Sequence, residues 1–141
     1  MLQLTRYADW RARLSACVEA RRRAPFSWSD RNCGLFVADC ILAMTGADPA
    51  AAFRGSFTTA IGARRALGRA GYPSLHDFAA TLLPAAHPSA ARVGDVMWFA
   101  GATGTHQESV GVVVGERVMV YRDDGLGSLP LTAGARAFLV G

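Results

Sequence analysis

The stretch SWSDRNCGLFVADCILAMTG, residues 27–46, places a cysteine between a polar turn and an apolar run. Apolar side chains then recur at the spacing of one helix face, at Cys33, Phe36, Val37, Cys40, Ile41 and Met44. Asn32 is a residue type that caps helix N-termini, and Gly46 can take the left-handed conformation that ends a helix. The stretch therefore predicts a central helix with Cys33 in its first turn and one face in the core.

Further helices are expected on both sides of this central one. Apolar side chains at helical spacing predict an amphipathic helix within residues 5–23. An aspartate followed by proline suggests a short helix over residues 48–53. Two more helical stretches are predicted over residues 58–71 and 74–83, the second with a start that resembles a capping box.

Strands are expected after Pro84. Four short segments are rich in β-branched or aromatic residues and are separated by turn residues: GDVMWF, SVGVVVG, ERVMVYR and ARAFLVG. Helices followed by strands are typical of the α+β class. We therefore predict a single domain over residues 1–141, with helices in about 5–83 packed on a small antiparallel sheet in about 93–140.

Composition and charge narrow the class of protein. The 141 residues are 51% hydrophobic and 18% charged, and no window reaches the roughly 18 apolar residues of a membrane span. The net charge of +4 includes an arginine run at residues 21–23, which suits an anionic polymer or the C-terminal end of a helix. Because no nucleic-acid motif accompanies the run, we favour the helix end and expect no nucleic-acid partner. The charged N-terminal stretch lacks the apolar segment of a secretory signal.

The three cysteines do not show the paired spacing of a disulfide framework or a zinc ribbon. Cys33 and Cys40 lie on one predicted helix, so their Cα atoms are about 10 Å apart, which is too far for a disulfide. Cys17 falls on the apolar face of the first helix, where a buried packing side chain is expected. We expect no metal ion and no other cofactor.

Cys33 is the residue that the sequence singles out for chemistry. A thiol attacks as its thiolate, and a helix N-terminus lowers a thiol pKa through partial positive charge and unpaired N–H groups. This argument predicts that Cys33 is the most reactive of the three thiols. Its face of the helix points towards the sheet, so a base for it has to come from a facing strand.

The order of three segments resembles a known enzyme family. The chain resembles the NlpC-type cell-wall peptidases, papain-like enzymes that cleave peptide links in peptidoglycan. The segments that carry the resemblance are, in order, NCGLFVADCI, RVGDVMWF and SVGVVVG. The chain resembles more closely a small family of phage and prophage proteins encoded among tail genes. This resemblance is carried by ADPAAAFRGSF, by the alanine-rich helix after it, and by the GDV, GVVVG and GL segments. The chemistry of that family is not established. The resemblance covers most of the chain from Trp28 onward and implies a papain-like NlpC-type fold.

The resemblance assigns roles to particular residues. It makes Cys33 the catalytic nucleophile and puts Asn32, a candidate substrate contact, where the family has aspartate. Gly94 and Asp95 match the pair that opens the first strand of the family. Ser109 occupies the position of the catalytic histidine. Because a hydroxyl does not take a proton from a thiol near neutral pH, the family's catalytic dyad is absent in its usual form.

Other side chains are candidates for the missing base. His106 lies three residues before Ser109 in an apparent loop, and a shift of that loop would bring it to the mouth of the strand. His76 and His87 are expected to be surface or capping residues. Glu108 would hold charge in the site, but a carboxylate alone is a poor base for a thiol.

Two further positions have alternative interpretations. Arg54 is either a structural anchor, with its guanidinium tying a turn to neighbouring groups, or a clamp for substrate, and we favour the anchor. The family's third polar position, which orients the base, falls near Tyr121 or Arg122. Neither residue type is a conventional partner for a catalytic histidine.

The resemblance implies a phage or prophage tail-tip component, made in the bacterial cytoplasm and located in the virion tail. Tail hub or fibre proteins are the expected partners, and peptidoglycan is a candidate ligand. We expect the fold to be structural or directed to the cell wall, with degenerate catalysis. The alternative is an active peptidoglycan endopeptidase or amidase with Cys33 as nucleophile and His106 as base. A third class, a free-standing amidase or transglutaminase-like enzyme, would share the cysteine and the sheet.

Overall fold

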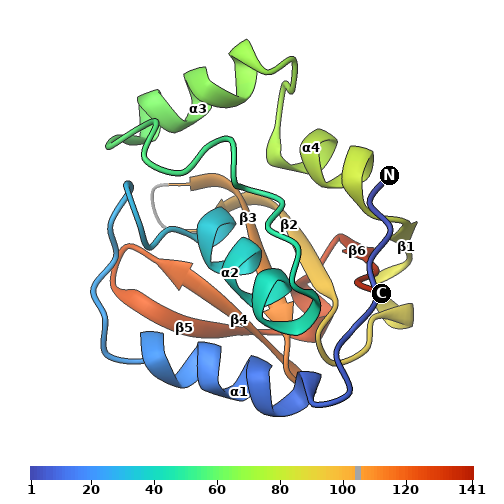
Figure 1. The fold of residues 1–141 in the computed structure, drawn as a ribbon. Helices are drawn as coiled ribbons and strands as arrows, with labels where there is room; N and C mark the ends of the chain where they lie inside the picture. The colour runs from blue at the N-terminus through green and yellow to red at the C-terminus, as the bar shows by residue number, and fades with distance from the viewer. Residues whose placement is uncertain (104–105) are drawn as a thin grey trace.

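Helix α2 (Cys33–Thr45) lies at the centre of the fold, as its apolar face predicts (Figure 1). The computed structural model describes residues 1–103 and 106–141, except for the side chains of residues 102, 103, 106 and 107. The Asn32 side chain accepts a hydrogen bond from the Leu35 N–H at 3.0 Å and so caps α2. Gly46 ends the helix with φ of 81°, the left-handed conformation that glycine takes most easily.

Three other helices follow the sequence expectation with shorter bounds: α1 (Trp10–Arg21), α3 (Ala60–Arg69) and α4 (Leu75–Leu82). Ser74 caps α4, because its side chain accepts a hydrogen bond from the Asp77 N–H at 3.1 Å. The prediction of a helix over residues 48–53 is wrong, since these residues form turns. There, short-range bonds such as Phe53 N–H to the Ala50 carbonyl replace a helical ladder.

The strands form one antiparallel sheet in the order β1-β6-β2-β3-β4-β5. Their bounds are β1 (Ala85–Ala86), β2 (Val96–Thr103), β3 (His106–Val113), β4 (Arg117–Arg122), β5 (Gly125–Pro130) and β6 (Arg136–Phe138). Short 3-10 turns, η1 (Pro88–Ala90) and η2 (Leu131–Ala133), precede β2 and β6. The α+β class and the N-terminal helices with a C-terminal sheet are therefore confirmed. β5 was not expected, because its glycines and proline are typical of turns.

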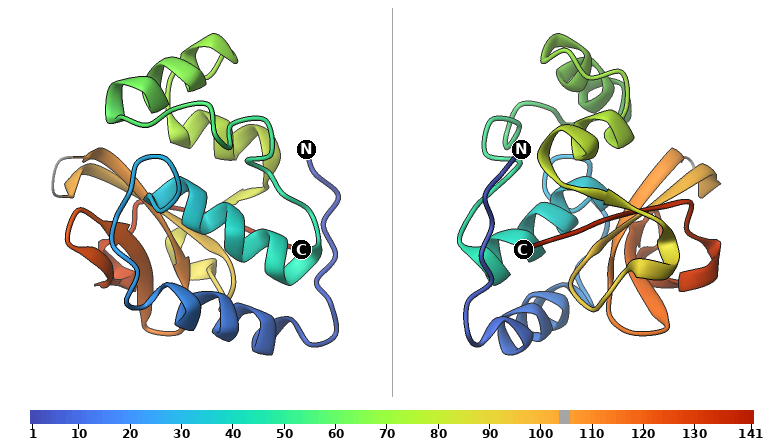
Figure 2. Two further views of the ribbon diagram at one scale, coloured as in Figure 1. Left: turned by 60° about the vertical axis from the view of Figure 1, so that its left-hand side comes forward. Right: turned by 90° about the vertical axis from the view of Figure 1, so that its right-hand side faces the viewer.

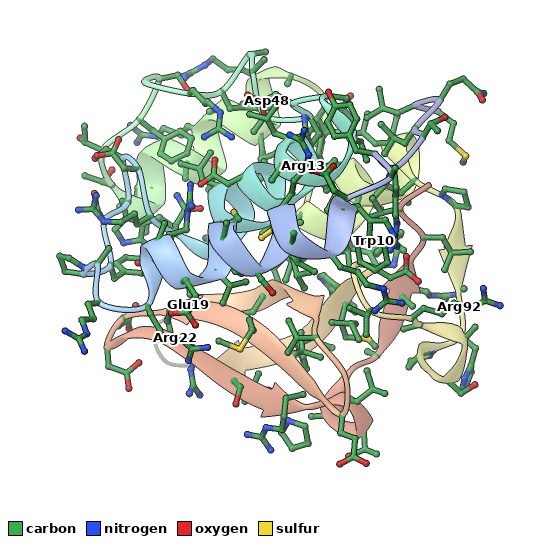
Figure 3. All side chains as sticks on the ribbon, turned by 60° about the horizontal axis from the view of Figure 1, so that its bottom comes forward. Trp10, Arg13, Glu19, Arg22, Asp48 and Arg92 are labelled. Atoms are coloured by element: carbon green, nitrogen blue, oxygen red, sulfur yellow. The ribbon has the colours of Figure 1, made fainter. Side chains whose placement is uncertain are left out.

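The helices occupy three levels beside the sheet. In both views of Figure 2, α1 lies below α2, and α3 and α4 lie above it. Helix α2 contacts α1, β3 and β4, and α4 contacts β3. Figure 3 looks onto the outer face of α1, which runs from Trp10 at one end to Glu19 and Arg22 near the other. Arg21 lies in the last turn of α1, which confirms that the arginine run closes a helix.

The pairing of β2 with β3 sorts the side chains of β3 onto two faces. Glu108 and Val110 pair with Ala100 and Trp98 on the face towards the helices, and Ser109 pairs with Phe99 on the other face. The ladder between β3 and β4 is short and joins residues 112–113 to 118–119. Val110 of β3 lies next to the start of α2, where its backbone N–H points at the Cys33 sulfur.

Among the described residues, no helix is both long and apolar enough to cross a membrane.

Candidate functional site

Cys33 begins α2 and is buried, with 4% of its surface exposed. The backbone N–H groups of Val110 and Gly34 donate towards its sulfur, as expected at a helix N-terminus. Burial nevertheless raises the pKa of the Cys33 thiol. The hydrogen bonds lower this pKa and the negative charge of Glu108 raises it, both to a smaller extent. The expectation of a lowered pKa is therefore wrong, because removal from water outweighs the donors of the helix head. Cys33 is a neutral thiol near pH 7.

Glu108 is the acidic group beside this thiol, and its carboxylate already has several donors. One oxygen accepts from the Leu75 N–H at 3.0 Å, and the other from the His76 N–H at 3.1 Å and the Trp98 indole N–H at 2.7 Å. Leu75 and His76 begin α4, where a negative charge is stabilised by unpaired N–H groups. Glu108 therefore ties α4 to β2 and β3. Sequence reasoning missed this link, because the bonded residues are more than 30 positions apart.

A cavity of about 340 Å³ lies between α2 on one side and α3 and α4 on the other. Cys33, Glu108 and Val110 line part of it. The rest of the lining is mainly apolar and comes from the helices and from the 49–57 segment, including Leu35, Ile41, Phe53, Phe57, Leu67 and Phe78. The thiol thus faces an apolar space with few polar groups, a character typical of small-molecule or peptide sites.

Helix α4 covers the head of α2. A Cβ atom placed on Gly34 would lie 3.6 Å from the Leu75 side chain. Leu75 is also part of the cavity lining together with Cys33. Access to the Cys33 sulfur therefore depends on how firmly α4 is held in place.

Ser109 does not share the cavity with Cys33. It is 1% exposed, and its side chain lies on the face of β3 opposite to that of Glu108 and Val110. The sequence argument placed Ser109 opposite Cys33 because it occupies the histidine position of the NlpC-type motif. The structure corrects this expectation, because a side chain one residue along a strand points to the other face.

The structure describes the side chains of two of the three histidines. His76 is half-buried, with its ring edge-to-face on Trp98 at 4.8 Å and on Phe138 at 5.5 Å, so it packs rather than serving as a surface or capping residue. His87 does cap a turn, since its ring accepts a hydrogen bond from the Ser89 N–H at 3.1 Å. The His106 side chain lies outside the described part of the structure. Its assignment as base stays a prediction.

The remaining candidates hold the scaffold together. Both ends of the Asn32 amide are engaged, because its nitrogen also donates to the Trp28 carbonyl at 2.9 Å. Arg54 contacts Asp48 at 2.7 Å and Asp39 of α2 at 2.7 Å, which supports the anchor and not the clamp. This anchor uses two carboxylates.

Tyr121 closes the end of α1 instead of orienting a base. Its hydroxyl lies 2.6 Å from the Ala24 carbonyl and 3.0 Å from the Arg21 carbonyl. Its ring packs edge-to-face on Phe36 of α2. Arg122 follows it as the last residue of β4. The position near Tyr121 therefore links α1, α2 and the sheet.

Among the described residues, there is no group of three or more histidine, cysteine, aspartate or glutamate side chains that could hold a metal ion.

Comparison with known proteins places the chain in a family. A family model described as "Domain of unknown function (DUF6950)" matches residues 5–140. The chain belongs to this family. Among solved structures, this DUF6950 chain is similar to the NlpC/p60 domain of the peptidoglycan hydrolase SagA, with a TM-score of 0.57 and 14% identity over 94% of this chain and 100% of that one. The likeness concerns the fold and confirms an NlpC-type architecture for the DUF6950 chain. A search of curated proteins found no match.

The raised pKa of Cys33 predicts a loss of stability in alkali. A thiol whose pKa is higher in the folded than in the unfolded state stabilises the fold fully below the unfolded value, about 8.5. This stability is lost as pH rises from there through the folded pKa. Urea unfolding under reducing conditions measures the free energy of unfolding at about pH 7 and about pH 9.5. The decrease between these two pH values is expected to be about 1 kcal/mol smaller in Cys33→Ala than in the wild type. The same drop in both proteins would contradict the raised pKa.

Proposed function

We propose that this protein is a cell-wall-directed component of a phage or prophage tail tip that uses an NlpC-type fold without hydrolysis. The observation that supports it best is the environment of Cys33. The thiol is buried and neutral, and the charged group beside it is the Glu108 carboxylate. A papain-like nucleophile instead needs a thiolate, which a neighbouring imidazolium stabilises and a carboxylate opposes.

The lining of the cavity supports binding in place of cleavage. Its apolar side chains come from three helices, and its polar groups include Asn32, Arg64 and Glu108. Such a site suits a short peptide with small apolar side chains, a chemistry that peptide links of the cell wall offer. Attack on a bound carbonyl would require the Cys33 sulfur to approach it, whereas Leu75 and the rest of α4 cover the head of α2.

The assignment to a tail tip rests on the segments from residue 47 onward that resemble the phage and prophage family. A tail would bring such a module to peptidoglycan, with a hub or fibre protein as its carrier. The fold likeness to a domain of a peptidoglycan hydrolase is compatible with this location.

An active peptidoglycan endopeptidase or amidase is the second candidate, and one observation favours it. The N–H groups of Gly34 and Val110 that point at the Cys33 sulfur are donors of the kind that stabilise an anion at a helix head. In that case His106 would be the base, and α4 would have to move.

Sedimentation with purified peptidoglycan sacculi separates the two candidates. We expect the protein to co-sediment with sacculi and to release no soluble peptide fragments, and Cys33→Ala to bind equally well. Mass spectrometry of virions of the encoding phage is expected to find the chain in the tail. Release of fragments by the wild type and not by Cys33→Ala would establish the peptidase instead. Absence from virions would remove the tail-tip location.

A further inference from the structure

A pair of thiols lies between α1 and α2, away from the Cys33 cavity. The sulfur of Cys17 on α1 is 3.6 Å from the sulfur of Cys40 on α2, at hydrogen-bond distance for thiols. A disulfide requires sulfurs about 2.05 Å apart, so the two atoms need to approach by about 1.5 Å. Changes in side-chain rotamer supply movements of this size. No local sequence pattern indicates this pair, because the two residues belong to different helices.

The two thiols differ in access. Cys17 is 8% exposed and lines a shallow surface depression together with Arg13, Arg21 and Asp39. Cys40 is fully buried behind it. A small oxidant can therefore reach Cys17 from the depression, whereas Cys40 has no exposed surface and is not part of the lining.

The pKa values of the two thiols are shifted in opposite directions. The hydrogen bond to Cys40 lowers the pKa of Cys17, and the charge of Arg21 acts in the same direction. Arg21 is held close by its bond to the Cys17 carbonyl at 3.0 Å, and it also bonds Asp39. The same hydrogen bond raises the pKa of Cys40, as does burial. Of the two thiols, Cys17 therefore loses its proton more readily, although burial opposes this loss.

We propose that Cys17 and Cys40 form a dithiol site that peroxides oxidise to a disulfide joining α1 to α2. The Cys17 thiolate attacks one oxygen of the peroxide, so an S–O bond forms and the O–O bond breaks, and the leaving oxygen takes a proton. The Cys40 sulfur then attacks the Cys17 sulfenic acid, so the S–S bond forms, the S–O bond breaks and water leaves with the Cys40 proton. In total, two thiols and one peroxide give one disulfide, one alcohol or water, and one water.

Peptide mapping after treatment of the reduced full-length protein with hydrogen peroxide tests the proposal. We expect one disulfide between Cys17 and Cys40, with Cys33 still free, a mass lower by two hydrogen atoms and full reversal by dithiothreitol. The oxidised protein is expected to unfold at a higher urea concentration than the reduced protein, because the new bond restricts the unfolded chain. Cys33→Ala serves as the control and should oxidise at the wild-type rate.

Two variants test the order of the steps. In Cys40→Ala, the Cys17 sulfenic acid should accumulate and be trapped by dimedone, whereas Cys17→Ala should give neither a sulfenic acid nor a disulfide. Mapping of the wild type decides the matter even if a variant fails to fold. Oxidation of Cys33 before Cys17, or conversion of Cys17 to sulfinic acid without a disulfide, would overturn the proposal.

Discussion

Replacing Asp95 with alanine is expected to lower the free energy of unfolding by about 3–5 kcal/mol, because it breaks a buried ion pair from one side. Asp95 is 4% exposed and lies directly before β2. One of its oxygens accepts from the Arg6 guanidinium at 3.0 Å and from the Val140 N–H at 2.9 Å. Its other oxygen accepts from the Arg92 N–H at 2.9 Å. Alanine would leave all three donors without this acceptor.

Arg6 is the reason why Asp95→Ala is expected to weaken contacts beyond those of Asp95 itself. It also donates to the Val140 carbonyl at 2.7 Å and to the Val93 carbonyl at 2.8 Å, so it joins both ends of the chain to the sheet. The C-terminus lies beside the N-terminal segment in Figures 1 and 2. Burial lowers the pKa of Arg6, and Asp95 opposes that shift. Without the carboxylate, a largely buried cation has no charged partner.

Urea unfolding of wild type and Asp95→Ala at neutral pH measures the effect. Asp9→Ala is the matched control, because it removes an aspartate that pairs with Arg13 on the exposed surface of α1. Solvent screens such a pair, so the control is expected to unfold almost as the wild type does. Equal midpoints for Asp95→Ala and Asp9→Ala would refute the proposed role of the buried pair.

The parts of the fold that sequence reasoning predicted are those that local patterns specify. The apolar spacing from Cys33 to Met44 and the Asn32 cap predict α2, and the β-branched segments predict β2, β3, β4 and β6. Residues 48–53 carry a good helix-start signal, but the segment forms turns, and Arg54 after it pairs with Asp39 of α2 as well as with Asp48. Tertiary pairing thus overrode a local propensity there.

The contacts that define the site depend on chain segments that the sequence keeps far apart. The motif placed Ser109 correctly on its second strand. Successive side chains of a strand point to opposite faces, however, so Ser109 points away from the face that carries Glu108 and Val110. The position of Glu108 beside α4 and of Cys17 beside Cys40 follows from helix packing, which no local pattern encodes. The family resemblance predicted the role of Gly94 and Asp95 as a strand opener, but not that Asp95 holds both termini.

Glu108→Ala is expected to raise the rate of Cys33 alkylation by about 30-fold or more. The carboxylate holds the first turn of α4 through the Leu75 and His76 N–H groups, and it also binds Trp98. Hydrogen bonds to charged groups contribute about 1.5–3 kcal/mol each, but the freed N–H groups regain water when α4 opens. A fall of about 2 kcal/mol in the free energy of that opening corresponds to about 30-fold more of the open state.

Timed labelling with a maleimide, followed by peptide mapping, measures this opening with an internal reference. Cys40 is fully buried behind α1, so movement of α4 alone should leave its labelling rate unchanged. Glu116→Ala removes an exposed glutamate and should label as the wild type does. Glu108→Gln keeps one acceptor oxygen without the charge, so a smaller rise is expected. A parallel rise at Cys33 and Cys40 would indicate global unfolding, and no rise at all would show that Glu108 does not control access to the thiol. The barrier between Cys33 and any substrate would then lie in the packing of Leu75 and Phe78 over the cavity.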